Sequence, residues 1–171
     1  MKRNTDIPDP EKLKGLQPAC GDNPRVLILG SFPSVLSLEG AMYYGNPHNQ
    51  FWRIMADLFS IDISLPYPRR IEAITGRGIA LWDVIRSCSR PGSADTQIRN
   101  PVFNDIGSFL ATHPGITLVA LNGSTAARYF RQACRIPGVD TVLLPSTSPA
   151  HARASYEEKR EKWAIIKNAV R

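Results

Sequence analysis

The stretch "NPRVLILG" (residues 23–30) decides the fold class of this chain. Val26 to Leu29 form an uninterrupted apolar run that Gly30 closes, as expected of a strand buried on both faces of a parallel sheet. Similar short runs follow further along the chain at residues 78–84, 116–123 and 139–146. We therefore expect a sheet of buried parallel strands.

The segments between these runs have helical periodicity. After Asn49, the apolar residues Phe51, Ile54, Met55 and Leu58 mark one face of a helix. Further helices are expected within residues 103–113, 123–133 and 155–170. Alternating strands and helices without an internal repeat predict one α/β fold, a three-layer α/β/α sandwich. We expect a polar N-terminal segment over residues 1–24 and a single domain over 25–171.

Composition limits the possible partners. The 171 residues include 21 Lys and Arg against 15 Asp and Glu, and the net charge of +6 favours an anionic partner. The three cysteines are odd in number and widely separated, which fits a reducing cytoplasm, and neither they nor the three histidines show the spacing of a metal site. This spacing gives no reason to expect a metal. No apolar run approaches the roughly 18 residues of a membrane span, so we do not expect membrane association either.

Ligands of parallel α/β sheets bind outside the carboxyl ends of the strands. The segments that follow the predicted strands are rich in Ser, Asn, Gly and Pro, and they are residues 30–34 with 43–52 behind them, 82–93, 122–124 and 144–152. No G-x-S-x-G, G-x-x-x-x-G-K-[ST] or G-x-G-x-x-G motif occurs, which argues against a serine hydrolase, a P-loop protein and a dinucleotide-binding enzyme. The sequence predicts a polar cleft of another kind at this edge.

Five motifs, in this order, carry a family resemblance: "LILGSFPS", "YYGNPHNQFW", "GIALWDVIRSCSRPGSADTQI", "LNG" and "LPSTSPAHA". They resemble the uracil-DNA glycosylase superfamily, and most closely its hypoxanthine (deoxyinosine) DNA glycosylase branch, over residues 25–170. The resemblance implies a central four-stranded parallel sheet, DNA containing a deaminated base as substrate, and no cofactor. It also implies a monofunctional glycosylase of base excision repair that removes hypoxanthine. The alternatives are a uracil-excising member and a catalytically inactive DNA-binding relative.

We expect such a protein to be a monomer that acts in the cytoplasm at the nucleoid.

Cleaving an N-glycosidic bond builds positive charge on the sugar and negative charge on the departing base. An enzyme therefore needs donors at the base, a placed water, and groups that hold the base out of the duplex.

The residue that places the water cannot be the usual one of the superfamily. Most of the superfamily has an Asn or Asp third in the first motif, where this chain has Phe32. Asn49 is our candidate, in line with the hypoxanthine branch, because an amide oxygen can accept a hydrogen bond from water. Asn49 could instead cap its helix. Asn46 is the second choice, although its place before Pro47 also suits a turn.

Aromatic and polar side chains near these motifs are candidates for contact with the base. Tyr43, Tyr44 and Phe32 offer rings on which a flipped base could stack, and Phe32 and Tyr44 rank level. Asp83 could accept a hydrogen bond from N1–H of hypoxanthine while the amide of Asn122 donates to O6. Asp83 and Asn122 could equally form a helix cap or loop hydrogen bonds.

The segment "LPSTSPAHA" resembles the superfamily's second motif, in which a serine and backbone amides hold DNA phosphate. Ser148 and Pro149 match it, whereas Ser146 stands where a histidine is expected. His151 could approach the DNA. Without the usual histidine, and without the first-motif Asn or Asp, we expect slow chemistry.

Two charged segments complete the prediction. Arg90, with Arg86 and Arg99 near it, would suit phosphate contact from the segment 82–93, or could be solvated surface. The mixed run "YEEKREKWAIIK" is typical of an exposed helix face with alternating charge, and we assign it no function.

Overall fold

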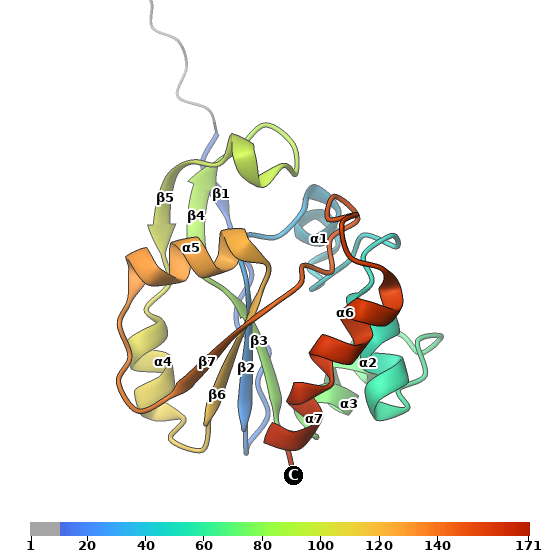
Figure 1. Ribbon diagram of the computed structural model, residues 1–171. Helices are drawn as coiled ribbons and strands as arrows, with labels where there is room; N and C mark the ends of the chain where they lie inside the picture. The colour runs from blue at the N-terminus through green and yellow to red at the C-terminus, as the bar shows by residue number, and fades with distance from the viewer. Residues whose placement is uncertain (1–10) are drawn as a thin grey trace, which may run out of the picture.

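The computed structural model describes residues 11–171. Its centre is a four-stranded parallel sheet in the order β3-β2-β6-β7 (Figure 1). The strands are β2 (Val26–Gly30), β3 (Ile79–Asp83), β6 (Leu118–Asn122) and β7 (Asp140–Leu144). Each lies within one of the apolar runs that predicted a strand, so the parallel sheet expected from the sequence is confirmed.

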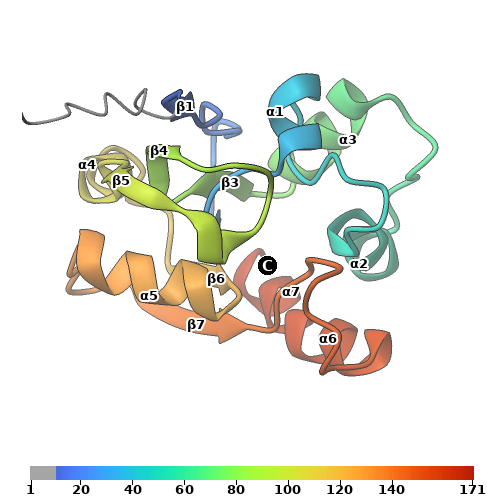
Figure 2. The ribbon, with the colours of Figure 1, turned by 90° about the horizontal axis from the view of Figure 1, so that it is seen from above.

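Helices cover both faces of this sheet, as Figures 1 and 2 show. One face carries α4 (Ile106–Thr112) and α5 (Ser124–Ala133). The other carries α2 (Phe51–Phe59), α3 (Tyr67–Thr75), α6 (Tyr156–Trp163) and α7 (Ile165–Ala169). The short α1 (Val35–Gly40) follows β2 at the carboxyl edge of the sheet. The predicted three-layer α/β/α sandwich is confirmed.

Strand β2 shows why this sequence folds in layers. Its alternate residues enter opposite cores: Ile28 packs in the core that contains α2 and α6, and Leu27 packs in the core that contains α4 and α5. A strand buried on both faces therefore needs apolar residues at every position. The apolar face expected of α2 is also buried. No helix among residues 11–171 combines the length and apolar content that a membrane crossing requires.

A second sheet was not predicted. It is antiparallel, in the order β1-β4-β5, and consists of β1 (Leu13–Lys14), β4 (Ile85–Ser89) and β5 (Arg99–Phe103). The prediction of a polar segment over residues 82–93 is wrong for residues 85–89, which form β4. Only Val84 separates the two strands, and β4 buries serines and a cysteine, so no apolar run marks it.

Residues 11–24 contact both sheets. β1 pairs with β4, and Ala19 forms a bridge with Leu81 in the central sheet. The hydroxyl of the buried Tyr43 donates to the carbonyl of Gln17 (2.7 Å). Residues 1–10 of the segment 1–24 lie outside the described residues, and the domain boundary at residue 25 stays a prediction.

Candidate active site

The carboxyl ends of the parallel strands hold a group of polar side chains that come from distant parts of the sequence. Gly30 of β2 pairs in register with Asp83 of β3, and Asn122 ends β6 on the other side of β2. Tyr44 and Thr147 approach the same edge through contacts with Asn122. We call these five residues the strand-end cluster. The structure thus brings together three predicted site residues, Tyr44, Asp83 and Asn122.

Asp83 is a buried carboxylate with an unusual environment. Its side chain is 5% exposed, and Oδ2 has no hydrogen-bond partner within residues 11–171. Burial, and next the nearby Asp95 carboxylate, raise the pKa of Asp83 to about 7, while the Arg90 guanidinium opposes that rise. An unpartnered buried carboxylate costs stability, and such groups concentrate at functional sites.

Gly30 makes room for this carboxylate. A Cβ at residue 30 would lie 2.5 Å from Asp83 Oδ1, so Gly30→Ala should displace Asp83 and lower the free energy of unfolding by about 1–3 kcal/mol. Gly107→Ala is the matched control: its Cβ would meet only Asp105 Oδ1 at 3.7 Å, in helix α4, and should be neutral or slightly stabilising. Thermal unfolding of both variants tests this. Equal stability for Gly30→Ala and the wild type would contradict the close approach.

Asn122 connects Tyr44 to the second-motif segment. Its amide nitrogen donates to Tyr44 Oη (3.2 Å) and to Thr147 Oγ1 (3.0 Å), and its Oδ1 accepts from the backbone N–H of Thr147 (3.0 Å). Both amide hydrogens are therefore used. Direct donation from Asn122 to a base would require one of these bonds to break. Thr147 is fully buried. The sequence prediction included Ser146 and Ser148 on either side of it but not Thr147.

The aromatic candidates differ in accessibility. Tyr44 stacks on Phe51 with 4.0 Å between ring centroids, and it also lines a cavity. Tyr43 lines the same cavity but is buried, and its hydroxyl is bonded to the carbonyl of Gln17. Phe32 is 6% exposed, and the guanidinium of Arg90 lies 5.0 Å from its ring centroid. Stacking of a base on Phe32 stays a prediction.

Arg90 supports the first-motif loop. Arg90 is 5% exposed, and its guanidinium donates from Nη2 to the carbonyl of Pro33 (2.5 Å) and from Nε to that of Gly92 (2.6 Å). Its Nη1 has no partner within the part of the chain that the structure describes. Contact between Arg90 and a phosphate stays a prediction, and the observed bonds hold the loop after β2 in place.

Asn49 lies where the segment 43–52 enters α2. Its Oδ1 accepts from the backbone N–H of Phe51 (2.9 Å), the first residue of α2, in an Asx turn that leads into the helix. The N-cap itself is Gln50, whose side chain makes no capping bond, so Asn49 is not the cap that the sequence left open. A carbonyl oxygen has two lone pairs, and the second remains available to a water. Asn46 Oδ1 accepts from the backbone N–H of His48 (2.9 Å), which is the geometry of a turn.

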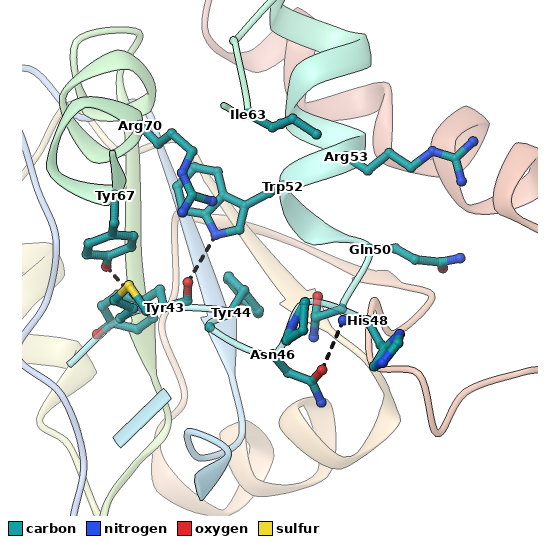
Figure 3. Close-up of a pocket in the computed structure, with 14 residues that line it drawn as sticks. Tyr43, Tyr44, Asn46, His48, Gln50, Trp52, Arg53, Ile63, Tyr67 and Arg70 are labelled. Carbon is teal, nitrogen blue, oxygen red and sulfur yellow. Dashed lines mark hydrogen bonds between the residues drawn. The ribbon is translucent and has the colours of Figure 1, made fainter. Parts of the chain in front are cut away.

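Asn49 is one of the residues that line a cavity of about 520 Å³. Figure 3 shows this cavity with Asn46, His48 and Gln50 labelled among the residues that line it. Residues 42–50 line one side of it, and Trp52, Arg53, Ile63, Tyr67 and Arg70 line the other. Of these described residues none is acidic, and Arg70 lies over the Trp52 ring at 4.6 Å. An aromatic, basic wall without carboxylates suits an anionic ligand that carries rings, such as a nucleotide.

The second-motif segment forms tight local turns. Ser146 Oγ accepts from the backbone N–H of Ser148 (3.2 Å), and Ser148 Oγ accepts from that of Ala150 (3.3 Å). Pro149 is exposed and His151 is half-buried. Because both serine oxygens act as acceptors in these turns, their hydroxyl protons remain available for a phosphate oxygen. Phosphate contact by Ser146, Ser148, Pro149 and His151 stays a prediction.

Lys159 joins the two loops that carry Asn49 and Ser148. Its side chain is 2% exposed, and Nζ donates to Gln50 Oε1 (2.9 Å) and to the carbonyl of His151 (2.8 Å). No carboxylate lies within ion-pair distance of it in residues 11–171, and burial lowers the pKa of its ammonium group. The prediction that this charged run forms an exposed helix face is wrong for Lys159.

The described residues 11–171 contain no group of three or more His, Cys, Asp and Glu side chains placed to hold a metal ion. The strand-end cluster can act through hydrogen bonds and charge. Its groups are the carboxylate of Asp83, the phenol of Tyr44 and the amide of Asn122 at the carboxyl edge of the sheet.

Comparison with known proteins places this arrangement in a family. A solution NMR structure from Methanosarcina acetivorans, named provisionally as a uracil DNA glycosylase, superposes with a TM-score of 0.81. It is 31% identical, over 94% of this chain and 99% of that one. Proteins named hypoxanthine DNA glycosylase from Methanosarcina barkeri and Methanosarcina acetivorans are 34% and 33% identical. The alignments cover 90% and 91% of this chain, and 96% and 98% of theirs.

The family model described as "Uracil DNA glycosylase superfamily" matches residues 17–169. This span contains all five motifs that carried the resemblance, together with the strand-end cluster, Asn49 and the second-motif segment. The chain belongs to the uracil DNA glycosylase superfamily.

Proposed function

We propose that this protein is a monofunctional DNA glycosylase that hydrolyses the N-glycosidic bond of deaminated bases in DNA, hypoxanthine above all. Superfamily membership and the two relatives named hypoxanthine DNA glycosylase support the reaction class and the base. DNA binding by a monomer in the cytoplasm, at the nucleoid, is part of the same proposal, and the net charge of +6 suits it.

The observation that carries the proposal is the unpartnered Oδ2 of Asp83 at the strand ends. Deamination replaces the ring-nitrogen lone pair of adenine by an N–H group at N1 of hypoxanthine. An ionised carboxylate only accepts hydrogen bonds, so it pairs with N1–H and repels the lone pair of adenine. Uracil presents the same kind of N–H, so the carboxylate alone separates deaminated bases from their parents rather than hypoxanthine from uracil.

In the proposed reaction the bond between C1′ of deoxyribose and N9 of hypoxanthine breaks, and its electron pair leaves with the base. The oxygen of a water molecule forms the new bond to C1′. One water proton passes to solvent, and the base takes up a proton from solvent. Asn49 orients this water through its free lone pair. A neutral amide is too weak a base to remove the proton, so stabilisation of the departing base carries much of the rate.

Phosphate contacts would hold the strand over this edge. The serine hydroxyls at residues 146 and 148, with Lys159 behind the loop, supply donors and positive charge next to Asn49. Phosphate contacts fix register without recognising sequence. We therefore expect damage recognition to depend on the flipped base and not on its neighbours.

Incubation with modified oligonucleotides tests the function. Purified protein is mixed with single-stranded and duplex strands that carry one deoxyinosine, one deoxyuridine or one deoxyxanthosine, and with an unmodified strand. Hot alkali then cleaves any abasic site. We expect the deoxyinosine strand to break only after alkali. Breakage of the deoxyuridine strand alone would establish the uracil-excising alternative, and binding without breakage in any lane would establish the inactive DNA-binding alternative.

A further inference from the structure

The hydrogen-bond arrangement around Asn122 fixes the direction of a hydroxyl proton. Asn122 Oδ1 accepts from the backbone N–H of Thr147, and a backbone N–H can only donate. The amide is therefore oriented with its NH₂ group toward Tyr44 Oη and Thr147 Oγ1. Tyr44 Oη is the acceptor in its bond, so the Tyr44 proton must point away from Asn122.

Tyr44 Oη and the Asp83 carboxylate lie next to each other above Gly30. A Cβ built on Gly30 would lie 3.8 Å from Tyr44 Oη and 2.5 Å from Asp83 Oδ1. No hydrogen bond donated by the Tyr44 hydroxyl is found within residues 11–171, and Asp83 Oδ2 is also unpartnered there. Burial, and next Asp83, raise the pKa of the Tyr44 phenol above its ordinary range, so it keeps its proton at neutral pH.

The hydroxyl is held rigidly. The Tyr44 ring stacks on Phe51 with an interplanar angle of 22°, and its backbone has a φ of 55°, in the left-handed region that side chains other than glycine's rarely adopt. Such strain costs roughly 1–3 kcal/mol and is concentrated at functional sites. The Tyr44 hydroxyl, a fixed donor, lies beside the Asp83 carboxylate, a fixed acceptor. This pair is complementary to a base edge that has a carbonyl next to an N–H.

We propose that the Tyr44 hydroxyl donates the hydrogen bond to the exocyclic oxygen of the flipped base, O6 in hypoxanthine, and that Asn122 acts through Tyr44 as a positioning residue. This inference rests on the proposed function. Asp83 accepts from N1–H at the same time, so the pair recognises the edge that deamination creates. Adenine presents an amino group at that position, and two donors would face each other.

The bond also assists departure of the base. As the glycosidic bond breaks, negative charge spreads into O6, and a donor fixed at O6 interacts more strongly with that charge than with the neutral ground state. No proton is transferred from Tyr44. The loss of a single such donor typically lowers the rate by about 100-fold or more.

Changing one atom of the substrate tests the proposal. Single-turnover excision is measured for wild type and Tyr44→Phe on strands containing deoxyinosine or deoxy-6-thioinosine, which keeps N1–H and replaces O6 with sulfur, a weak acceptor. We expect Tyr44→Phe to lower excision of hypoxanthine by about 100-fold and of the thio base by less than about tenfold. Equal loss on both substrates would mean a structural role for Tyr44 and would overturn the proposal.

Two further variants complete the experiment. Tyr43→Phe is the matched control, because it removes a hydroxyl that is bonded to Gln17 in the core, and the ratio of its rates on the two substrates should stay at the wild-type value. Asn122→Asp keeps an acceptor for Thr147 but draws the Tyr44 proton toward residue 122. It should resemble Tyr44→Phe, with little further loss in the double variant. A wild type inactive on deoxyinosine would reject the proposed function itself, whereas an active wild type with an unaffected Tyr44→Phe would reject only this inference.

Discussion

Asn49→Ala should lower excision of hypoxanthine by about 10²–10⁴-fold while binding of the same DNA is retained. The amide oxygen of Asn49 keeps one lone pair beyond that used by the N–H of Phe51, and alanine has no group that can orient a water. Single-turnover rates on a deoxyinosine duplex, together with the dissociation constant of that duplex, measure the two quantities separately.

A loss of activity could also follow from losing the Asx-turn bond to the first N–H of α2, since removing a side chain that satisfies such an N–H costs about 1 kcal/mol. Asn49→Ser separates the two roles, because a serine hydroxyl can form the same turn to the backbone N–H of Phe51, but its shorter side chain does not reach a water held by the longer amide. We expect Asn49→Ser to unfold at the wild-type temperature and to remain as inactive as Asn49→Ala. Wild-type rates in Asn49→Ser would show that Asn49 only supports the turn that leads into α2.

Asp83→Asn should make the protein less active and more stable. The amide replaces the charged acceptor of the proposed bond to N1–H. Losing one partner of such a buried pair costs roughly 2–5 kcal/mol, so excision of hypoxanthine should fall by about 30- to 5,000-fold at about pH 8. The wild-type rate should rise with pH and level off above about 7, the pKa of Asp83, and the rate of the variant should be independent of pH. Pre-steady-state rates across this range test the expectation.

The Asp83 carboxylate supports activity but lowers the stability of the folded protein. Its pKa in the folded protein lies above its ordinary value of 3.8, so the native state holds the proton more tightly than the unfolded chain. Stability therefore falls as pH rises from about 4 to about 7, and ionisation costs on the order of 4 kcal/mol. Asp83→Asn should be more stable than the wild type above pH 7, with the advantage vanishing near pH 4. The titratable and charged groups that interact with Asp83 are Asp95, Arg90, Tyr43 and Tyr44. A variant no more stable than the wild type at high pH would contradict this environment.

The central sheet could be predicted because parallel strands buried on both faces require continuous apolar runs, as in Val26 to Leu29. Strand β4 could not, since it buries Ser87 and Cys88 rather than a row of large apolar residues. Lys159 lies in a run of charges that is typical of a solvated helix, and only the folded chain shows its ammonium between two loops.

The site was predictable as a set of residues but not as a set of bonds. Asp83 and Asn122 were found because they end predicted strands, and the motif resemblance pointed to Tyr44 and Asn49. The bond from Asn122 to Tyr44 joins residues 78 positions apart, and the direction of its donor follows from Thr147, which no motif singled out. Hydrogen-bond directions depend on three-dimensional geometry, and a single sequence does not contain it.

The most direct measurement is the mass of a strand with one deoxyinosine after incubation with the protein and before any alkali. We predict a product in which hypoxanthine has been lost and a water gained, with the strand unbroken, and free hypoxanthine in equal amount. An unchanged strand that is nevertheless bound by the protein, or a strand already broken at the deoxyinosine, would contradict a monofunctional glycosylase.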